Sequence, residues 1–282
     1  MRWLATSIFL GAVGVALWGC NNSSTSSSSA ESCTSGTDVV ETITTMINGP
    51  TVLSCTTNIA SDAPDWIKNN FHCVTVQTCS TTYKFILTSL PPYKTNYYSA
   101  ASGNQATFPT TGLSDGAARS KNPNTIATQS ITMYIPKSPT YRSSSWDSTS
   151  GSGLDCIGVT TYGVCMFNNQ AAPGDSLATE FATMDNGDDH PESTGKYHHH
   201  TEPYYLSDDD NKFIGVMLDG YPVYGKKKED NSFPTLDSNT HAVSCTTTLF
   251  PSGTYCYHVA NGTGVNADLI GSYFQGTRGS VQ

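Results

Sequence analysis

Short apolar runs recur along most of the chain, and turn-forming residues separate them. Runs of this length that are rich in Val, Ile, Thr and Tyr are typical of strands rather than helices. The predicted strands are Val74–Val76, Thr82–Leu87, Ile131–Ile135, Gly158–Val164, Lys212–Leu218 and Thr254–Val259. The pattern therefore predicts a mainly β fold, either a sandwich or an irregular barrel with long loops.

Helical periodicity is scarce, so we expect only one or two short helices. Ser61–Phe71 combines a Ser or Asp cap with an early proline, which are features of a helix start. Ser176–Met184 is a second and less regular candidate. The small polar residues of Ser143–Gly153 predict a long loop, which is a seam either inside one domain or between two subdomains.

The N-terminal residues have the pattern of an export signal. Arg2 is the only charged side chain before Glu31, and Ile8–Trp18 is an apolar run that is too short to span a membrane. The tetrapeptide L-W-G-C that ends at Cys20 resembles the lipobox of bacterial lipoproteins. This resemblance implies that Cys20 is acylated and becomes the new N-terminus, and plain secretion is the alternative.

On this interpretation the chain divides into a signal peptide (1–19), an acylated cysteine with a serine-rich linker (20–37) and a β-rich body (38–282). A linker made of Asn, Ser and Thr is flexible, so it would hold the body clear of a bilayer. We therefore expect a lipid anchor to a membrane of the bacterial cell envelope, at the outer membrane, on its periplasmic or its outer side.

The cysteines predict a body stabilised by disulfides. Nine are present, and eight remain when Cys20 is set aside. An even number in an exported chain predicts up to four disulfides, although their pairing does not follow from the number alone. Closure between neighbours in the sequence gives the hypothesis Cys73–Cys79, Cys156–Cys165 and Cys245–Cys256, with Cys33–Cys55 as the remaining pair.

The net charge of the chain indicates which classes of binding partner to expect. The chain has 14 basic and 23 acidic residues, and removal of residues 1–19 takes away one Arg, which leaves 13 against 23. A net charge of −10 excludes nucleic acid as an expected partner and favours cations. Solubility alone is also a sufficient reason for an acidic surface.

Candidate chemistry centres on histidine, because six of the seven histidines lie in the C-terminal half. Tyr197–His200 has no helical spacing and is flanked by Gly195 and Pro203, so it is predicted to be extended. Side chains alternate along a strand, which puts His198 and His200 on one face and the intervening His199 on the other. Two imidazoles on one face can bind one metal ion. The alternative is a solvated polar strand.

Tyr197–His200 resembles the Y-H-Y-H motif of the YHYH-domain proteins, with His199 in place of the second tyrosine. Further elements of that family are matched in order by Asp189–Pro191, Phe213–Gly225, Leu236–Asp237 with Asn239–His241, Tyr255–Val259, and Ile270–Gly271 with Phe274–Gly276. The resemblance covers 130–282, which we take as a YHYH-like domain. It implies an exported protein, often lipid-anchored or disulfide-bearing, but it implies no particular reaction.

The resemblance includes a second motif copy, in which Cys256 stands where the family has the first histidine. A disulfide with Cys245 is the favoured interpretation of Cys256, and a thiolate ligand is the alternative. The hypothetical ligands of a copper or zinc ion are His198, His200 and His258, with one of His190 or His241. Three further residues would assist them, Asp219 by orienting an imidazole and Tyr197 and Tyr257 by proton transfer.

Three functions stay open from the sequence. The first is a metal-binding envelope lipoprotein, and the second is a metal-dependent hydrolase or oxidase that uses the same cluster. The third is a tyrosine-rich surface, from 15 tyrosines, that binds glycan or another envelope protein. Two acidic segments, Asp185–Asp189 and Asp208–Asn211, are either Ca²⁺ sites or solvated turns. No nucleophile motif and no nucleotide-binding motif is found in the sequence. The sequence therefore does not decide whether the protein is an enzyme.

Overall fold

The computed structural model describes residues 32–43, 46, 52–150, 156–207 and 211–282. The predicted signal peptide, Cys20 and most of the predicted linker lie outside these residues, as do Asp208–Asp210 and the end of the predicted loop Ser143–Gly153. The described part of the chain is mainly β, as predicted, and each of the six predicted strands overlaps an observed strand. No helix in it is long and apolar enough to cross a membrane.

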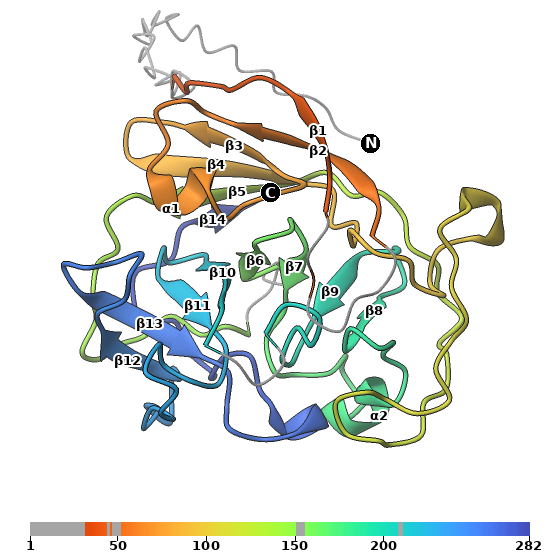
Figure 1. Ribbon diagram of the computed structural model, residues 1–282. Coiled ribbons are helices and arrows are strands. Elements are labelled where there is room, and N and C mark those ends of the chain that lie inside the picture. Colours follow the sequence, from red (N-terminus) through yellow and green to blue (C-terminus); the bar gives the residue numbers. More distant parts are fainter. Residues whose placement is uncertain (1–31, 44–45, 47–51, 151–155, 208–210) are drawn as a thin grey trace, which may run out of the picture. The chain divides into compact units, whose positions relative to one another are not determined.

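Two sheets make up this fold (Figure 1). The six-stranded sheet has the order β1 (Val39–Thr42), β2 (Ser54–Ile59), β3 (Thr75–Thr78), β4 (Thr82–Leu87), β5 (Ile131–Pro136) and β14 (Ser280–Val281). The eight-stranded sheet has the order β12 (Ala242–Cys245), β13 (Thr254–His258), β11 (Pro222–Tyr224), β10 (Phe213–Met217), β6 (Gly158–Thr160), β7 (Cys165–Met166), β9 (Tyr197–His199) and β8 (Asp189–Pro191). Neither sheet closes into a barrel among the described strands, so the sandwich-like alternative applies.

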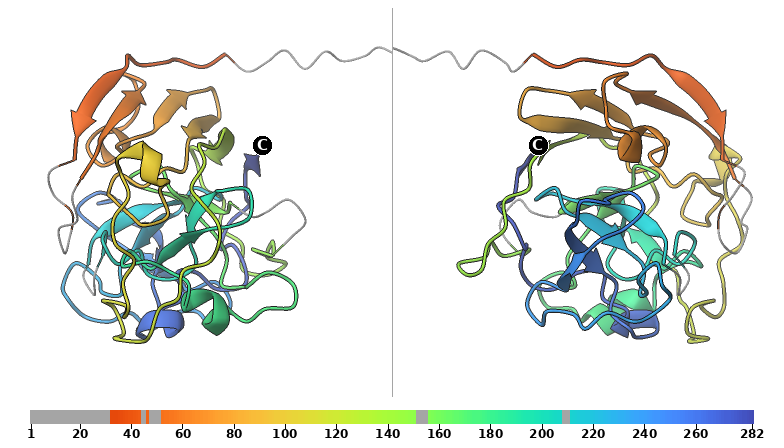
Figure 2. Two further views of the ribbon diagram at one scale, coloured as in Figure 1. Left: turned by 90° about the vertical axis from the view of Figure 1, so that its right-hand side faces the viewer. Right: turned by 60° about the vertical axis from the view of Figure 1, so that its left-hand side comes forward.

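The six-stranded sheet buries one face. In β5 the residues Ile131, Met133 and Ile135 are buried, and the residues between them are half-buried. This alternation follows from the two-residue period of a strand, and it turns the apolar side chains toward one hydrophobic core that also includes Val159 and Val216 of the second sheet. Figure 2 shows from two further sides that β1–β4, in red to orange, cover the eight-stranded sheet.

The central strands of the eight-stranded sheet are buried on both faces, and glycine lets them approach closely. A Cβ atom on Gly215 of β10 would lie 2.1 Å from the Val159 carbonyl oxygen of β6, so no larger residue fits there without a shift of the backbone. The pairing of β10 with β11 also shifts register between Phe213 and Gly215. The predicted run Lys212–Leu218 is therefore a strand with a bulge in it.

Both predicted helices are present and short. One is α1 (Asp65–Lys68), within the predicted segment Ser61–Phe71. The other is α2 (Leu177–Phe181), whose start is capped by the Ser176 hydroxyl, which accepts a hydrogen bond from the Thr179 amide at 3.2 Å. Two 3₁₀ turns, η1 (Ala100–Ser102) and η2 (Gly264–Asn266), complete the described helical segments.

Four disulfides stabilise the fold, and two of the predicted pairings are wrong. Cys156–Cys165 and Cys245–Cys256 are confirmed. The remaining four cysteines pair as Cys33–Cys79 and Cys55–Cys73, not as Cys33–Cys55 and Cys73–Cys79.

Strand geometry explains this correction. Cys73 and Cys79 flank β3, and six extended residues separate their Cα atoms by roughly 20 Å, whereas a disulfide requires roughly 4.4–6.8 Å. Cys33 reaches Cys79 instead because the adjacent Thr34 and Thr78 form a β-bridge. Sequence proximity is thus a poor guide where the intervening residues form a strand.

Asp219 joins the turn between β10 and β11 to the closing segment of the chain. Its carboxylate accepts hydrogen bonds from the Tyr257 hydroxyl at 2.5 Å, the Gly276 amide at 2.8 Å and the Tyr221 amide at 3.2 Å. Asp219 therefore orients this turn, and not an imidazole as the sequence suggested. Burial raises the pKa of Asp219 from 3.8 to about 6, and the three hydrogen bonds oppose that rise.

We expect Asp219→Asn to flatten the pH dependence of stability between about pH 4 and pH 6. The folded pKa lies above the unfolded value, so the folded state binds this proton more tightly in that window. The free energy of unfolding of the natural protein therefore falls as the pH rises through it, by up to about 3 kcal/mol. Urea unfolding of both proteins at several pH values measures the difference. Parallel pH profiles for the two proteins would contradict this assignment.

Candidate metal centre

The candidate site is built on the antiparallel pair β8–β9. In this pair His190 lies directly opposite His198, and Asp189 lies opposite His199. Because successive side chains of a strand point to opposite faces, His190 and His198 share one face and Asp189 and His199 share the other. His200 follows β9 directly, and its side chain lies on the same face as His190 and His198. This agrees with the prediction of an extended segment.

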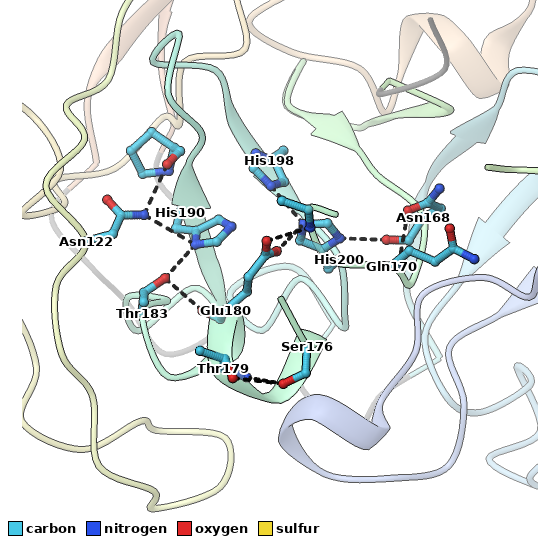
Figure 3. Close-up of polar contacts among 12 residues, drawn as sticks. Asn122, Asn168, Gln170, Ser176, Thr179, Glu180, Thr183, His190, His198 and His200 are labelled. Atoms are coloured by element: carbon cyan, nitrogen blue, oxygen red, sulfur yellow. Dashed lines mark hydrogen bonds and ion pairs between the residues drawn. The ribbon is translucent and has the colours of Figure 1, made fainter. Parts of the chain in front are cut away.

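Three imidazoles converge on that face (Figure 3). One ligand nitrogen from each of His190, His198 and His200 lies within 4.8 Å of the other two. The Nε2 atoms of His198 and His200 are 3.0 Å apart. All three rings are almost completely buried, with at most 5% of each residue exposed. The cluster can therefore hold one ion between three ring nitrogens.

Hydrogen bonds fix which nitrogen of each ring is available. The Nδ1 atoms of His198 and His200 lie 2.9 Å from the Lys196 carbonyl and 2.6 Å from the Asn168 carbonyl. A carbonyl only accepts hydrogen bonds, so both Nδ1 atoms carry the proton. The Nε2 lone pairs of these two rings are then free and face each other.

His190 follows the same rule through a hydroxyl group. Its Nδ1 atom lies 2.7 Å from Thr183 Oγ1, and the Thr183 hydroxyl donates its only proton to the Glu180 carbonyl at 2.7 Å. The hydroxyl must therefore accept from His190, so Nδ1 is again protonated and Nε2 is free. Such oriented imidazoles are typical of metal ligands.

The electrostatics of the cluster favour a cation. Burial lowers the pKa of His190 to about 3, and it lowers the pKa of His198 and of His200 as well, so the rings are neutral at pH 7. Two unprotonated Nε2 atoms 3.0 Å apart repel each other unless a positive centre lies between them. In a tetrahedral zinc site, with Zn–N bonds of about 2.05 Å, the ligand nitrogens are about 3.3 Å apart. The residues present therefore fit a metal ion.

A known protein family matches the part of the chain that carries these histidines. Residues 132–240 match the family described as YHYH protein. The chain contains a YHYH domain. No curated protein and no solved structure matches it.

The matched range of the YHYH domain contains all three converging histidines. It ends before His241 and before β13, which carries His258. The resemblance that the sequence suggested over 130–282 is therefore supported over 132–240 by this comparison.

Glu180 of α2 adds a carboxylate to the YHYH domain's histidine cluster. Its Oε2 atom lies 3.5 Å from His200 Nε2, and Figure 3 shows the side chain pointing from α2 toward that ring. The other carboxylate oxygen accepts a hydrogen bond from the Ala172 amide at 2.8 Å, which holds the side chain in place. The sequence analysis missed Glu180, because only the tertiary fold brings α2 to the cluster.

The cluster opens to a cleft with a volume of 810 Å³. Asp175, Glu180 and Glu192 line this cleft, and no Lys or Arg is among its described lining residues. The Phe167 ring stacks on His198 with 3.8 Å between ring centroids. A cation is attracted into such a cleft and an anion such as a phosphate is repelled. An ion held by three imidazoles would keep a coordination position open toward the cleft.

The opposite face of β9 carries a separate buried network. His199 Nδ1 contacts the Asp189 carboxylate, and both side chains are buried. Burial lowers the pKa of His199 to about 3 and raises the pKa of Asp189, so burial favours the uncharged form of both groups. Tyr93 donates a hydrogen bond to Asp189 at 2.6 Å. The middle histidine of the triplet is thus buried in contact with a carboxylate, on the face opposite to the cluster.

Tyr197 belongs to this second network and not to the histidine cluster. Its hydroxyl lies 2.6 Å from Asp185 and 3.0 Å from the Tyr93 hydroxyl. Tyr197 therefore cannot exchange a proton directly with the Nε2 atoms on the other face, which corrects the assisting role given to it from the sequence.

The predicted ligands His258 and His241 are not brought to the cluster. In the order of the sheet, β11, β10, β6 and β7 lie between β13 and β9. His258 Nδ1 lies 2.9 Å from the Gly225 carbonyl, and the His258 ring stacks on Tyr224. His241 lies in the turn before β12, with a φ angle of 63°. Tyr257 points to Asp219 instead, so the second motif copy builds the core and not the metal centre.

The acidic segment Asp185–Asp189 was expected to be either a Ca²⁺ site or a solvated turn. The structure shows that it is not a solvated turn. Its three aspartates are buried. The Asp188 carboxylate pairs with Arg119 at 3.2 Å, and the Asp185 carboxylate accepts hydrogen bonds from Tyr197 and from the Gly187 amide. Positive and neutral donors thus occupy the oxygens that a Ca²⁺ ion would need. The other acidic segment, Asp208–Asn211, lies mostly outside the described residues.

We expect His199→Ala to lower the free energy of unfolding of the metal-free protein by roughly 2–4 kcal/mol, because Asp189 loses its partner inside the protein. His198→Ala is the matched control, since it removes an equally buried ring of the same strand from the other face. It should cost less stability, because the ring that remains beside it is relieved of a facing lone pair. Urea unfolding with a chelator present measures both. Equal losses in the two variants would contradict the division of β9 into two networks.

Proposed function

We propose that this protein is a lipid-anchored protein of the bacterial cell envelope whose YHYH domain binds one copper or zinc ion. The ligands are the Nε2 atoms of His190, His198 and His200, and Glu180 is the nearest carboxylate. The observation that carries the proposal is the tautomer that the hydrogen bonds impose, because all three rings donate from Nδ1 and present Nε2 to one point.

The chemistry of the donor set supports copper or zinc. Three neutral imidazoles are a common ligand set for both ions, whereas Mg²⁺ and Ca²⁺ prefer carboxylate and carbonyl oxygens. Burial keeps the rings unprotonated, so a proton competes weakly for the lone pairs at neutral pH. When bound, such an ion supplies a Lewis-acidic centre at the wall of the cleft.

Two further observations support a place outside the cytoplasm. All eight cysteines of the described residues form disulfides, which persist in oxidising compartments. The L-W-G-C tetrapeptide at Cys20 follows a short apolar run and precedes a serine-rich segment, which is the arrangement of a lipoprotein precursor.

Protein that has been stripped with a chelator is expected to take up about one equivalent of Cu(II) or Zn(II). His198→Ala and His200→Ala should each weaken binding at least tenfold, by about 1.4 kcal/mol or more, because each removes one of three imidazole ligands. Isothermal titration of an untagged protein measures the affinity. His258→Ala is the control, since the structure places that ring elsewhere in the sheet. Uptake that is unchanged in His198→Ala, or that is lost in His258→Ala, would overturn the ligand assignment.

The Cys20→Ala precursor is expected to lose lipid labelling and to move from the membrane fraction to the soluble fraction of the envelope. One lipid-modified cysteine is the only anchor that this proposal assigns, so its removal leaves nothing to hold the body at the bilayer. Metabolic labelling with a radioactive fatty acid, followed by fractionation, measures both effects. A labelled Cys20→Ala protein, or an unlabelled natural protein, would refute the anchor.

A further inference from the structure

We propose that the histidine cluster and Glu180 together hydrolyse neutral carboxylic esters, with Glu180 as the general base. This inference rests on the proposed function, because an ion held by three imidazoles keeps one coordination position open toward the cleft. A water molecule at that position lies beside the Glu180 carboxylate. The class of reaction follows from the place of this carboxylate, and the class of substrate follows from the charges of the cleft.

One oxygen of Glu180 faces the cluster without a hydrogen-bond donor of its own. Oε1 accepts a hydrogen bond from the Ala172 amide at 2.8 Å, whereas Oε2 lies 3.5 Å from His200 Nε2. That Nε2 atom carries no proton, because the Nδ1 atom of the same ring donates to the Asn168 carbonyl. Within the described part of the chain, no donor contacts Oε2. The side chain is 16% exposed and lines the cleft, so a molecule in the cleft can reach its carboxylate.

Glu180 stands beside the proposed ion and not among its ligands. In the described part of the chain, only His190, His198 and His200 form a set whose ligand atoms all lie within 4.8 Å of one another. The ligand atoms of a tetrahedral zinc ion are about 3.3 Å apart, so the carboxylate is too far from at least one ring nitrogen to share the ion. Figure 3 shows the side chain reaching from α2 to the edge of the cluster. A base that takes a proton from a water molecule at the fourth position needs this place.

The same turn of the chain positions Glu180 and one of the ligands. Glu180 belongs to α2, whose first turn is capped by the Ser176 hydroxyl. The Thr183 hydroxyl donates to the Glu180 carbonyl and accepts from His190 Nδ1, both at 2.7 Å. The ligand and the base are therefore held in a fixed relation before any substrate binds, which is what rapid catalysis requires.

Hydrolysis of an ester at this site needs no reactant besides water. Glu180 Oε2 takes a proton from the water molecule while the water oxygen forms a bond with the acyl carbon. The bond from that carbon to the leaving oxygen then breaks, and Glu180 returns the proton to the leaving oxygen. The products are a carboxylic acid and an alcohol. The positive charge of a bound ion stabilises the negative charge that develops on the carbonyl oxygen.

The charges of the cleft select the class of substrate. Asp175, Glu180 and Glu192 line it, and no Lys or Arg is among its described lining residues. Phosphate esters and other anionic substrates are therefore repelled. The volume of 810 Å³ lies within the range of about 300–1,000 Å³ that is usual for sites of small ligands. A small neutral ester meets both conditions.

The full chain, loaded with one equivalent of Zn(II), is assayed with 4-nitrophenyl acetate as the neutral ester and with 4-nitrophenyl phosphate as the anionic one. We expect zinc-dependent hydrolysis of the acetate and none of the phosphate. Glu180→Gln keeps an oxygen for the Ala172 amide but supplies no base. It should lower kcat by about 10²- to 10⁴-fold with little change in KM. It should weaken Zn(II) binding by less than the tenfold loss expected for His198→Ala.

Glu229→Gln is the matched control. Glu229 also accepts a hydrogen bond from a backbone amide, that of Thr248 at 2.9 Å, but it is not among the lining residues of the cleft. This variant should leave kcat unchanged. Acetohydroxamate supplies a readout that needs no turnover, because it binds the zinc-loaded protein only through an open coordination position. We expect it to bind and to inhibit hydrolysis.

Zinc uptake without ester hydrolysis would overturn this inference and leave the proposed metal site intact, whereas absence of zinc uptake would overturn both. An unchanged kcat in Glu180→Gln would exclude Glu180 as the base. A tenfold or larger loss of zinc affinity in that variant would make Glu180 a ligand instead, and failure of acetohydroxamate to bind would show that no position is open. Thermal unfolding shows whether each variant is folded. If Glu180→Gln misfolds, Glu180→Asp tests the same role, because it withdraws the carboxylate by one carbon and should also lower kcat.

Discussion

The pairing of β8 with β9 is the constraint on which the functional part of this structure depends. It sets His190 against His198 and Asp189 against His199, so the alternation of two short strands sorts these four polar side chains onto two faces. Both faces are buried, and therefore every one of these side chains needs a partner inside the protein. A shift of this pair by one residue would exchange the two faces and leave neither network complete.

The buried polar side chains of the two faces find their partners in different ways. On one face, His199 contacts the Asp189 carboxylate, and Tyr93 donates a hydrogen bond to the same carboxylate. On the other face, the outer nitrogens of the rings donate to oxygens of the protein, and the inner nitrogens are left facing each other. The first arrangement is complete by itself. The second is complete only with a positive centre, which distinguishes a ligand site from a structural network.

Much of the fold could be predicted from the sequence, because strand alternation and capping are local properties. The strand Thr82–Leu87 and the capped helix at Ser176 follow from neighbouring residues alone. The shared face of His198 and His200 follows from the same two-residue period. His190 was found through its family resemblance, since no local pattern links it to β9.

The features that could not be predicted from the sequence all depend on which elements become neighbours in the fold. Cys33 and Cys79 pair across 46 residues because of a β-bridge that no sequence spacing reveals. His258 was expected beside His198, but β13 joins the sheet next to β11 and so lies at its other end. Glu180 reaches the cluster only through the packing of α2. The sequence pattern predicts the face of a strand on which a side chain lies, and the topology of the fold decides which residues that side chain contacts.

The disulfide Cys156–Cys165 lies beside the strand that carries part of the histidine cluster. It joins the residues just before β6 to β7, and β7 is the parallel neighbour of β9, with Cys165 paired to His198. A reduced chain lacks this crosslink, so its unfolded ensemble is larger and the strand that supports the ligands is held less firmly. If the proposed centre binds an ion, then oxidation of this pair and ion binding favour each other by thermodynamic linkage.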